Sequence, residues 1–291
     1  MGQGDQGRQH QGGVNAAAPA DRSRLVRDLR ALGLRPGDLA MVHASLRALG
    51  PVEGGPAEVL AALLDTVGPE GTLFAFVSWD QSPYLETLDG RSLPAEARAN
   101  WPAFDAASAP PYREFGAFNR FVCAHPQVRR SAHPDASMAA IGRLADELTR
   151  DHSLHEGYGR GSPLERFVAH GGRVLLLGAP LDAVTVLHYA EAIADIPGKR
   201  RVRYEVPVLQ DGRKVWLRAE NFDTNGILDV FAHEGEPDAV ERIARDYVAQ
   251  GHGRRGRVGN APCHLFEADP IVAYGVRWLQ AQGLSSNPTR R

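Results

Sequence analysis

The chain has 291 residues, 43% of them hydrophobic, and is therefore long enough to bury a sizeable core. Its 33 Lys and Arg residues nearly balance 35 Asp and Glu residues, and a net charge of −2 argues against a nucleic-acid partner. Two cysteines exclude a dense disulfide framework, and the polar start and absence of a long apolar run predict a cytoplasmic protein without membrane contact.

The beginning of the chain differs in composition from the rest. Residues 1–20 are rich in Gly, Gln and Ala without hydrophobic periodicity, so we expect a disordered tail, followed by one domain over residues 21–291. The first predicted helix covers residues 21–33, because it has leucines at helical spacing, an aspartate that can cap its start and a glycine that can end it.

Helices and strands then alternate. Residues 80–115 have many Pro, Ala and acidic residues and no clear periodicity, which predicts a long surface excursion that serves a site. The alternation predicts an α/β fold in which helices flank a mixed, mostly buried sheet. Strands are expected at 38–46, 71–79 and 171–178, helices at 56–68, 163–172, 184–196, 237–250 and 269–282, and a hairpin at 200–220.

The helix expected at residues 184–196 carries the strongest candidate for catalysis. His188 and Glu191 are three residues apart, so they share one face of a helix that starts just after a buried strand. A carboxylate beside an imidazole raises its basicity and fixes its tautomer, which suits a general base. A surface ion pair or a core histidine would produce the same pattern.

Two further segments could contact a ligand. In RRSAHPDAS, Arg129 and Arg130 offer charge, and Ser131 and Ser137 offer donors, for a pyrophosphate or a pantetheine arm; a solvated basic turn is the alternative. In MVHASLRALG (residues 41–50), backbone amides at the end of a strand could face a ligand. The chain has no G-x-S-x-G elbow, which argues against a serine hydrolase, and no Rossmann fingerprint or P-loop. It also lacks the H-E-x-x-H motif of zinc sites, so we expect no catalytic metal.

Acidic and aromatic residues gather in the excursion and in a late loop. Carboxylates around a cleft can hold a multiply charged amino sugar, and aromatic rings can pack on it, although solvated loop carboxylates have the same composition. The residues concerned are Trp79, Asp80, Tyr84, Glu114, Asp223, Asp229, Glu234, Glu236 and Asp238.

Several motifs, taken in order, resemble the antibiotic acetyltransferase family of aminoglycoside 3-N-acetyltransferases. The resemblance covers nearly everything from about residue 21 to the final helix, and it implies a family fold distinct from the common small-acetyltransferase fold. The motifs are VHASLRALGPVEGGPAEVLAALLDTVGPEGTLFAFVSW, RSAHPDASMAAIG, YGRGSPLERF, GGRVLLLGAPLDAVTVLHYAEAIADIPGKRR and NFDTNGILD.

The resemblance implies direct transfer of an acetyl group from acetyl-CoA to the 3-amino group of a 2-deoxystreptamine aminoglycoside, and thus antibiotic resistance. His188 would be the base, oriented by Glu191 and Asp223. The CoA channel would include Ser45, Leu46, Arg47, Ser131, Ser137, Tyr158, Ser162 and Thr185. The drug would meet Trp79, Asp80, Tyr84, Asp223, Glu236 and Asp238.

Other functions remain open at the level of sequence. The same fold could acylate another small amine in biosynthesis, and a cleft with an arginine in place of convergent carboxylates would indicate an acidic acceptor. A module that only binds the drug would need no base such as His188. A serine hydrolase is a fourth possibility, which covalent labelling by a fluorophosphonate would reveal. We expect a monomer or a homodimer.

Overall fold

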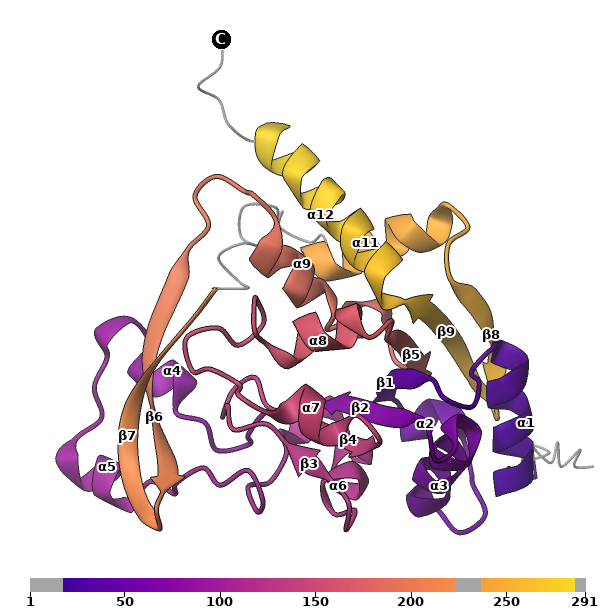
Figure 1. Ribbon diagram of the computed structural model, residues 1–291, viewed down its shortest axis with the longest axis horizontal. Helices are drawn as coiled ribbons and strands as arrows, with labels where there is room; N and C mark the ends of the chain where they lie inside the picture. The colour runs from indigo at the N-terminus through magenta and orange to yellow at the C-terminus, as the bar shows by residue number, and fades with distance from the viewer. Residues whose placement is uncertain (1–17, 223–236, 286–291) are drawn as a thin grey trace, which may run out of the picture.

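The computed structural model describes residues 18–222 and 237–285 of the chain. Within these residues, seven strands form one sheet in the order β3-β4-β2-β1-β5-β9-β8 (Figure 1). The strands are β1 (Leu39–Ala44), β2 (Thr72–Phe76), β3 (Arg129–Arg130), β4 (Met138–Gly142), β5 (Arg173–Leu177), β8 (Arg254–Val258) and β9 (Ala261–Glu267).

The sheet is mixed and its centre is buried, as the sequence predicts. Strand β1 runs parallel to both β2 and β5, and the pairs farther out, β2 with β4 and β5 with β9, are antiparallel. All five residues of β2 and the last four of β5 are buried, which explains why these strands read as continuous apolar runs. The carboxyl ends of β1, β2 and β5 therefore meet at one edge of the sheet.

Helices cover both faces of this sheet, and each face has its own apolar core. One layer contains α1 (Arg22–Leu32), α2 (Leu46–Leu49), α3 (Pro56–Val67) and α6 (Phe118–Cys123). The other contains α7 (Ala145–Thr149), α8 (Pro163–Ala169), η3 (Leu181–Ala183), α9 (Leu187–Ile193), α11 (Ala239–Ala249) and α12 (Ala268–Ser285).

Local signals set the ends of several helices. Asp21 caps α1 by accepting a hydrogen bond from the N–H of Arg24, and Gly33 ends the helix with a φ of 116°. Helix α9 is shorter than predicted, because the residues before Leu187 form a turn and the chain becomes extended at Ala194. The ammonium of Lys199 donates to the carbonyls of Ala192 and Ala194, at 2.7 and 2.6 Å, and so satisfies the end of this helix.

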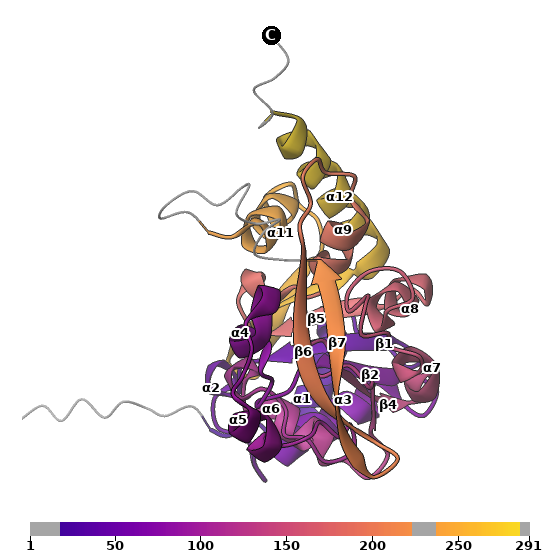
Figure 2. The same cartoon turned by 90° about the vertical axis from the view of Figure 1, so that its left-hand side faces the viewer.

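The predicted hairpin is present, but it forms a separate two-stranded sheet of β6 (Arg201–Gln210) and β7 (Arg213–Phe222) rather than joining the mixed sheet. Asp211 and Gly212 both have positive φ, as a tight hairpin turn requires. The hairpin stands beside the excursion (Figure 2), which contains α4 (Tyr84–Thr87), η1 (Leu88–Gly90), α5 (Ala95–Asn100) and η2 (Arg113–Phe115).

The excursion is fastened to the hairpin by hydrogen bonds. The N–H of Phe104 donates to the carbonyl of Pro207, and its carbonyl accepts from Leu209, both at 2.8 Å. The Thr87 hydroxyl donates to the carbonyl of Glu205 at 2.9 Å. These bonds let the excursion and the hairpin enclose space beyond the sheet edge.

Near the N-terminus, folded structure begins slightly before the boundary predicted for the tail. Ala20 is buried and its N–H donates to the carbonyl of Pro51 at 2.9 Å. Residues 1–17 lie outside the described part of the chain. Among the described helices, none combines the length and the apolar character that crossing a membrane requires.

Candidate active site

The centre of the site is the pair that the sequence places on one helix face. The Nδ1 of His188 and the Oε2 of Glu191 lie 2.8 Å apart on α9. The Glu191 side chain is 1% exposed and that of His188 is 23% exposed, so the imidazole reaches the surface of a site whose carboxylate is enclosed. A carboxylate that accepts from Nδ1–H leaves the lone pair on Nε2, which is the form that accepts a proton.

The surroundings make His188 more basic than an ordinary histidine. Burial lowers the pKa of His188, but the charge of Glu191 and its hydrogen bond raise the pKa by more, with a smaller contribution from Asp238. The net effect is a pKa above the usual value. The imidazole is therefore a strong proton acceptor in this position.

Two aromatic groups adjoin His188. The ring of Tyr158 lies with its centroid 5.3 Å from that of the imidazole. His43, near the end of β1, has a pKa of about 4 because of burial and the neighbouring His188. Its Nε2 is buried and, among the described residues, has no hydrogen-bond partner. His43 is therefore neutral at physiological pH and does not compete with His188 as the base.

The loop that carries Tyr158 is held from two sides. On one side, the backbone N–H of Gly157 donates to Oδ1 of Asn221 at 2.5 Å. On the other, buried His152 contacts the hydroxyl of Ser131 and the carbonyl of Gly157, both at 2.9 Å. The loop thus has little freedom to move Tyr158 away from the imidazole.

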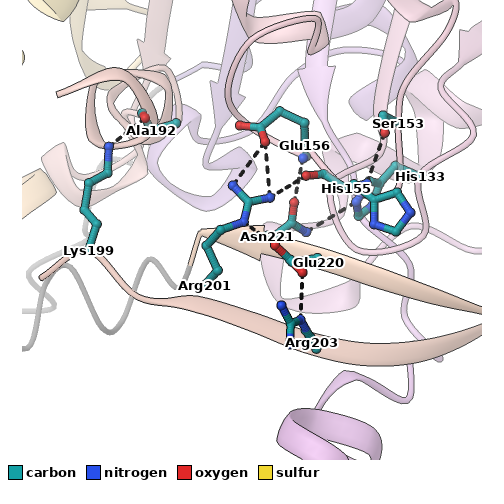
Figure 3. Close-up of polar contacts among 11 residues, drawn as sticks. His133, Ser153, His155, Glu156, Ala192, Lys199, Arg201, Arg203, Glu220 and Asn221 are labelled. Atoms are coloured by element: carbon teal, nitrogen blue, oxygen red, sulfur yellow. Dashed lines mark hydrogen bonds and ion pairs between the residues drawn. The ribbon is translucent and has the colours of Figure 1, made fainter. Parts of the chain in front are cut away.

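Charged groups of the hairpin also fasten this loop (Figure 3). The guanidinium of Arg201 points toward the loop and donates to Glu156 at 3.2 Å and to the carbonyl of His155 at 2.6 Å, while its Nε pairs with Glu220 of β7 at 2.5 Å. Arg203 also binds Glu220, at 2.8 Å. Hairpin and loop are therefore coupled by a network of charges beside the site.

A cavity of about 370 Å³ adjoins the His188–Glu191 pair, because Tyr158, which lines the cavity, also packs against the ring of His188. Its lining is aromatic and acidic, which suits the flat faces and ammonium groups of an amino sugar. The described lining residues are Phe76, Ser78, Trp79, Asp80, Ser82, Tyr84, Leu85, Glu86, Tyr112, Phe115, Asp135, Tyr158, Tyr204, Asn221 and Phe222.

Three residues predicted to meet the drug line this cavity. Trp79 is 2% exposed and its ring packs edge-on against Phe104. The carboxylate of Asp80 is paired with Arg113 at 2.6 Å, which lowers its pKa through that hydrogen bond. The ring of Tyr84 packs against that of Tyr204, with centroids 4.8 Å apart.

The other predicted drug contacts are in the late loop. Asp238 caps α11 by accepting from the N–H of Glu241 at 2.8 Å, and its charge reaches His188. Asp223 and Glu236 lie outside the described residues, as do Asp229 and Glu234.

The residues predicted to contact CoA divide into two groups. Ser45 caps α2 at the end of β1, and Leu46 and Arg47 begin that helix. Thr185, which is buried, precedes α9, and Tyr158 lines the cavity. In contrast, Ser131, Ser137 and Ser162 are fully buried, and their hydroxyls accept from Met138, Arg130 and Glu165 respectively. A direct contact between CoA and these three hydroxyls remains a prediction.

Both arginines of the 129–137 loop form hydrogen bonds or ion pairs within the protein. Arg130 donates to the carbonyls of Ser78 and Ala109 and, at 3.1 Å, to the hydroxyl of Ser137. Arg129 pairs with Asp146 at 2.7 Å on the surface. Arg130 therefore connects the loop to the excursion.

Sequence reasoning missed Asp135, Tyr204 and Asn221, which meet in one polar network at the cavity. The Ser82 hydroxyl hydrogen-bonds to Oδ1 of Asp135, and the Asn221 amide donates to the Tyr204 hydroxyl at 2.7 Å. The motif RSAHPDAS contains Asp135, but only the tertiary structure brings the hairpin to it. Among the described residues, no group of His, Cys, Asp and Glu could hold a metal ion.

Comparisons with known proteins identify the family of the chain. The family model described as "Aminoglycoside 3-N-acetyltransferase" matches residues 41–280. The chain is 61% identical over 257 residues to "Aminoglycoside N(3)-acetyltransferase III" of Serratia marcescens, covering 88% of this chain and 96% of that protein.

Solved structures show the same fold. "AAC-VIa bound to Sisomicin" has 52% identity and a TM-score of 0.88, covering 91% of this chain and 99% of that one. "AAC-IIIb binary with CoASH" has 41% identity and a TM-score of 0.85, covering 91% and 98%. With its mixed sheet, its two helical layers and a family match over most of its length, the chain belongs to the aminoglycoside 3-N-acetyltransferase family.

Proposed function

We propose that this chain transfers an acetyl group from acetyl-CoA to the 3-amino group of a 2-deoxystreptamine aminoglycoside, with His188 as the general base. The observation that carries this proposal is the pairing of His188 with buried Glu191 beside an acidic, aromatic cavity. The related structures named for sisomicin and for CoASH support the two substrate classes.

His188 solves the main chemical difficulty of the reaction. An ammonium has no lone pair and cannot attack a thioester, so a base has to remove a proton first. The raised pKa of His188 makes Nε2 able to accept that proton, and Glu191 stabilises the resulting imidazolium. The freed amine attacks the thioester carbonyl directly and forms the N–C bond. As the C–S bond breaks, the nitrogen gives up its extra proton, and the CoA sulfur takes a proton and leaves as the thiol.

Acetyl transfer is proposed to be direct because no described cysteine is placed to act as a nucleophile. Cys263 is buried and Cys123 is partly buried, and burial raises the pKa of both thiols. Incubation with acetyl-CoA alone, followed by intact-mass measurement, should therefore reveal no acetylated enzyme. An adduct that forms and then disappears when drug is added would contradict direct transfer.

The reaction is tested by measuring thiol release from acetyl-CoA with gentamicin, tobramycin or kanamycin, and by assigning the product by mass spectrometry and NMR. One acetyl group on the 3-amino nitrogen is expected. The absence of thiol release with every aminoglycoside, from folded protein that binds CoA, would overturn the proposal. Expression in a susceptible bacterium should raise its resistance to the drugs that are acetylated.

The role of His188 is tested with H188A. H170A is a matched control, because His170 is also within 2.8 Å of a glutamate but lies at the exposed end of α8, whereas His188 packs against Tyr158 of the cavity lining. We expect H188A to lose turnover by roughly 10²- to 10⁴-fold while it still binds CoA. H170A should retain wild-type turnover. Unchanged turnover in H188A would exclude His188 as the base.

A further inference from the structure

The cavity beside His188 contains a carboxylate that the sequence patterns do not single out. Asp135 lies in the cavity lining, on the segment between β3 and β4. Its Oδ1 is bound by the hydroxyl of Ser82. Its Oδ2 is buried and makes no hydrogen bond of ordinary geometry within the described parts of the chain, although the Tyr204 hydroxyl is near enough to lower the pKa of Asp135. A buried carboxylate oxygen without a partner is costly, so a site that retains one is suited to a ligand that supplies a donor.

The other carboxylates in the described lining differ from Asp135. Asp80 is neutralised by Arg113, whose guanidinium and backbone N–H both donate to it. Glu86 is exposed to solvent. Among the described residues, no Lys, Arg or His forms an ion pair with Asp135. Asp135 is therefore the enclosed negative group that a cation entering the cavity would meet.

The walls around Asp135 fit a cationic sugar. Tyr84 and Tyr158 also line the cavity and are only partly buried, so their rings can pack against the sugar and its ammonium groups. Burial raises the pKa of Asp135 to about 6, and the hydroxyls of Ser82 and Tyr204 oppose the rise. At neutral pH the group is largely ionised, and a bound ammonium would hold it so.

We propose that Asp135 binds an ammonium group of the aminoglycoside other than the 3-amino group, and that it thereby helps to select which drugs are acetylated. The inference rests on the proposed function, because it places the drug in the cavity beside His188. Tyr158 lines that cavity and contacts His188, so a drug anchored at Asp135 can extend along Tyr158 toward the base.

The test is D135N, which keeps the shape of the side chain and removes its charge. Steady-state kinetics are measured for neomycin and paromomycin, which differ by one amine-for-hydroxyl exchange, and for kanamycin B and kanamycin A, which differ by another. For the pair whose additional amine binds Asp135, we expect D135N to raise the KM of the drug that carries this amine roughly ten- to a hundredfold. The kcat and the KM of acetyl-CoA should stay unchanged. If the two drugs of one pair differ in KM with the wild type but not with D135N, the amine in which they differ is the ammonium that Asp135 binds.

A KM for every drug within about twofold of wild type, or a loss confined to kcat, would overturn the inference. D146N is the matched control, because Asp146 is an exposed carboxylate on α7 outside the cavity lining, and it should leave all constants unchanged. S82A provides a second variant that keeps the charge, and it should raise the drug KM less than D135N does. Equal or larger effects of S82A would indicate that Asp135 only supports the loop.

Direct binding separates this inference from the proposed function. Calorimetry of neomycin with the wild-type chain and D135N, without acetyl-CoA, should show weaker binding to the variant. If the wild type binds neomycin tightly but never releases thiol, the proposed function fails while Asp135 can still be judged from the binding difference. If the wild type turns over and D135N binds equally well, only the inference fails.

Discussion

Oδ1 of Asn221, near the end of β7, accepts the backbone N–H of Gly157 at 2.5 Å, so the hairpin positions the loop whose next residue, Tyr158, packs against His188. A Cβ added at Gly157 would lie 2.6 Å from that Oδ1 and 3.0 Å from the Cβ of Ala136. Both Asn221 and Ala136 are buried, so neither can move aside easily to accommodate this Cβ.

We therefore expect G157A to displace the Tyr158 loop, to lower kcat/KM for the drug at least tenfold and to cost about 1–3 kcal/mol of stability. Steady-state kinetics and denaturant unfolding measure the two effects. G256A is the matched control, because the Cβ added there meets only the end of Leu32, at 3.1 Å. Wild-type kinetics in G157A would show that the position of the loop does not matter.

Adjacent arginines allow the role of the 129–137 loop to be tested. R130A would leave the carbonyls of Ser78 and Ala109 without their donor, so we expect it to destabilise the fold by about 3 kcal/mol. R129A removes only an exposed ion pair with Asp146 and should change stability by less than about 0.5 kcal/mol. Chemical denaturation measures both. A weaker affinity for acetyl-CoA in R130A with unchanged stability would instead support phosphate binding by this arginine.

The sequence predicts those parts of the fold and site that depend on neighbours along the chain. Helix α1 follows from Asp21, Gly33 and the spacing of its leucines, and the His188–Glu191 pair follows from one turn of helix. Strands β4 and β9 were not predicted, because β4 is a short segment after a loop and β9 alternates buried and exposed residues only in part. Their place in the sheet depends on pairing with β2 and β5.

The network around the cavity could not be predicted for the same reason. Asp135 and Asn221 are far apart in the sequence, and they line one cavity only because the hairpin forms its own sheet instead of extending the mixed one. Residue types alone also favoured the serines of the 129–137 loop as ligands. In the structure these serines are buried and hydrogen-bonded within the protein. Residue types do not reveal this, because it depends on contacts with distant residues, such as that between Ser131 and His152.

Acid should destabilise the fold through its buried histidines. Burial lowers the pKa of His152 to about 4, whereas an unfolded histidine titrates near 6.5. The unfolded chain therefore binds more protons between these values, so stability is lost as the pH falls through this window, by about 3 kcal/mol for this group. Asp135, whose pKa is raised to about 6, acts in the opposite direction and offsets part of the loss.

Unfolding free energy measured from pH 7 to pH 4 tests this expectation. H152Q cannot titrate, so its stability should depend less steeply on pH by about one proton. The variant should be less stable at pH 7 because it loses contacts with Ser131 and Gly157. The test is therefore the slope of unfolding free energy against pH, and not the stability at one pH. An unchanged slope would mean that His152 does not cause the loss in acid.

The pH dependence of turnover reports on the His188–Glu191 pair. The base works only when it is unprotonated, so kcat/KM should fall as the pH decreases through the pKa of His188, which lies above the ordinary histidine value. In E191Q the charge that raises this pKa is gone and burial still lowers it, so the acid limb should move to lower pH. Turnover at neutral pH should fall as well, because the neutral amide stabilises the imidazolium less.

D238N distinguishes the effect of charge from that of contact. The asparagine introduced in this variant would still cap α11, because its amide oxygen accepts the N–H of Glu241 as the Asp238 carboxylate does, and only a charge that acts on His188 is lost. The acid limb of D238N should therefore shift in the same direction as that of E191Q but by less. If the acid limb of the kcat/KM profile of E191Q lies at the same pH as that of the wild type, a group other than His188 limits the reaction in acid.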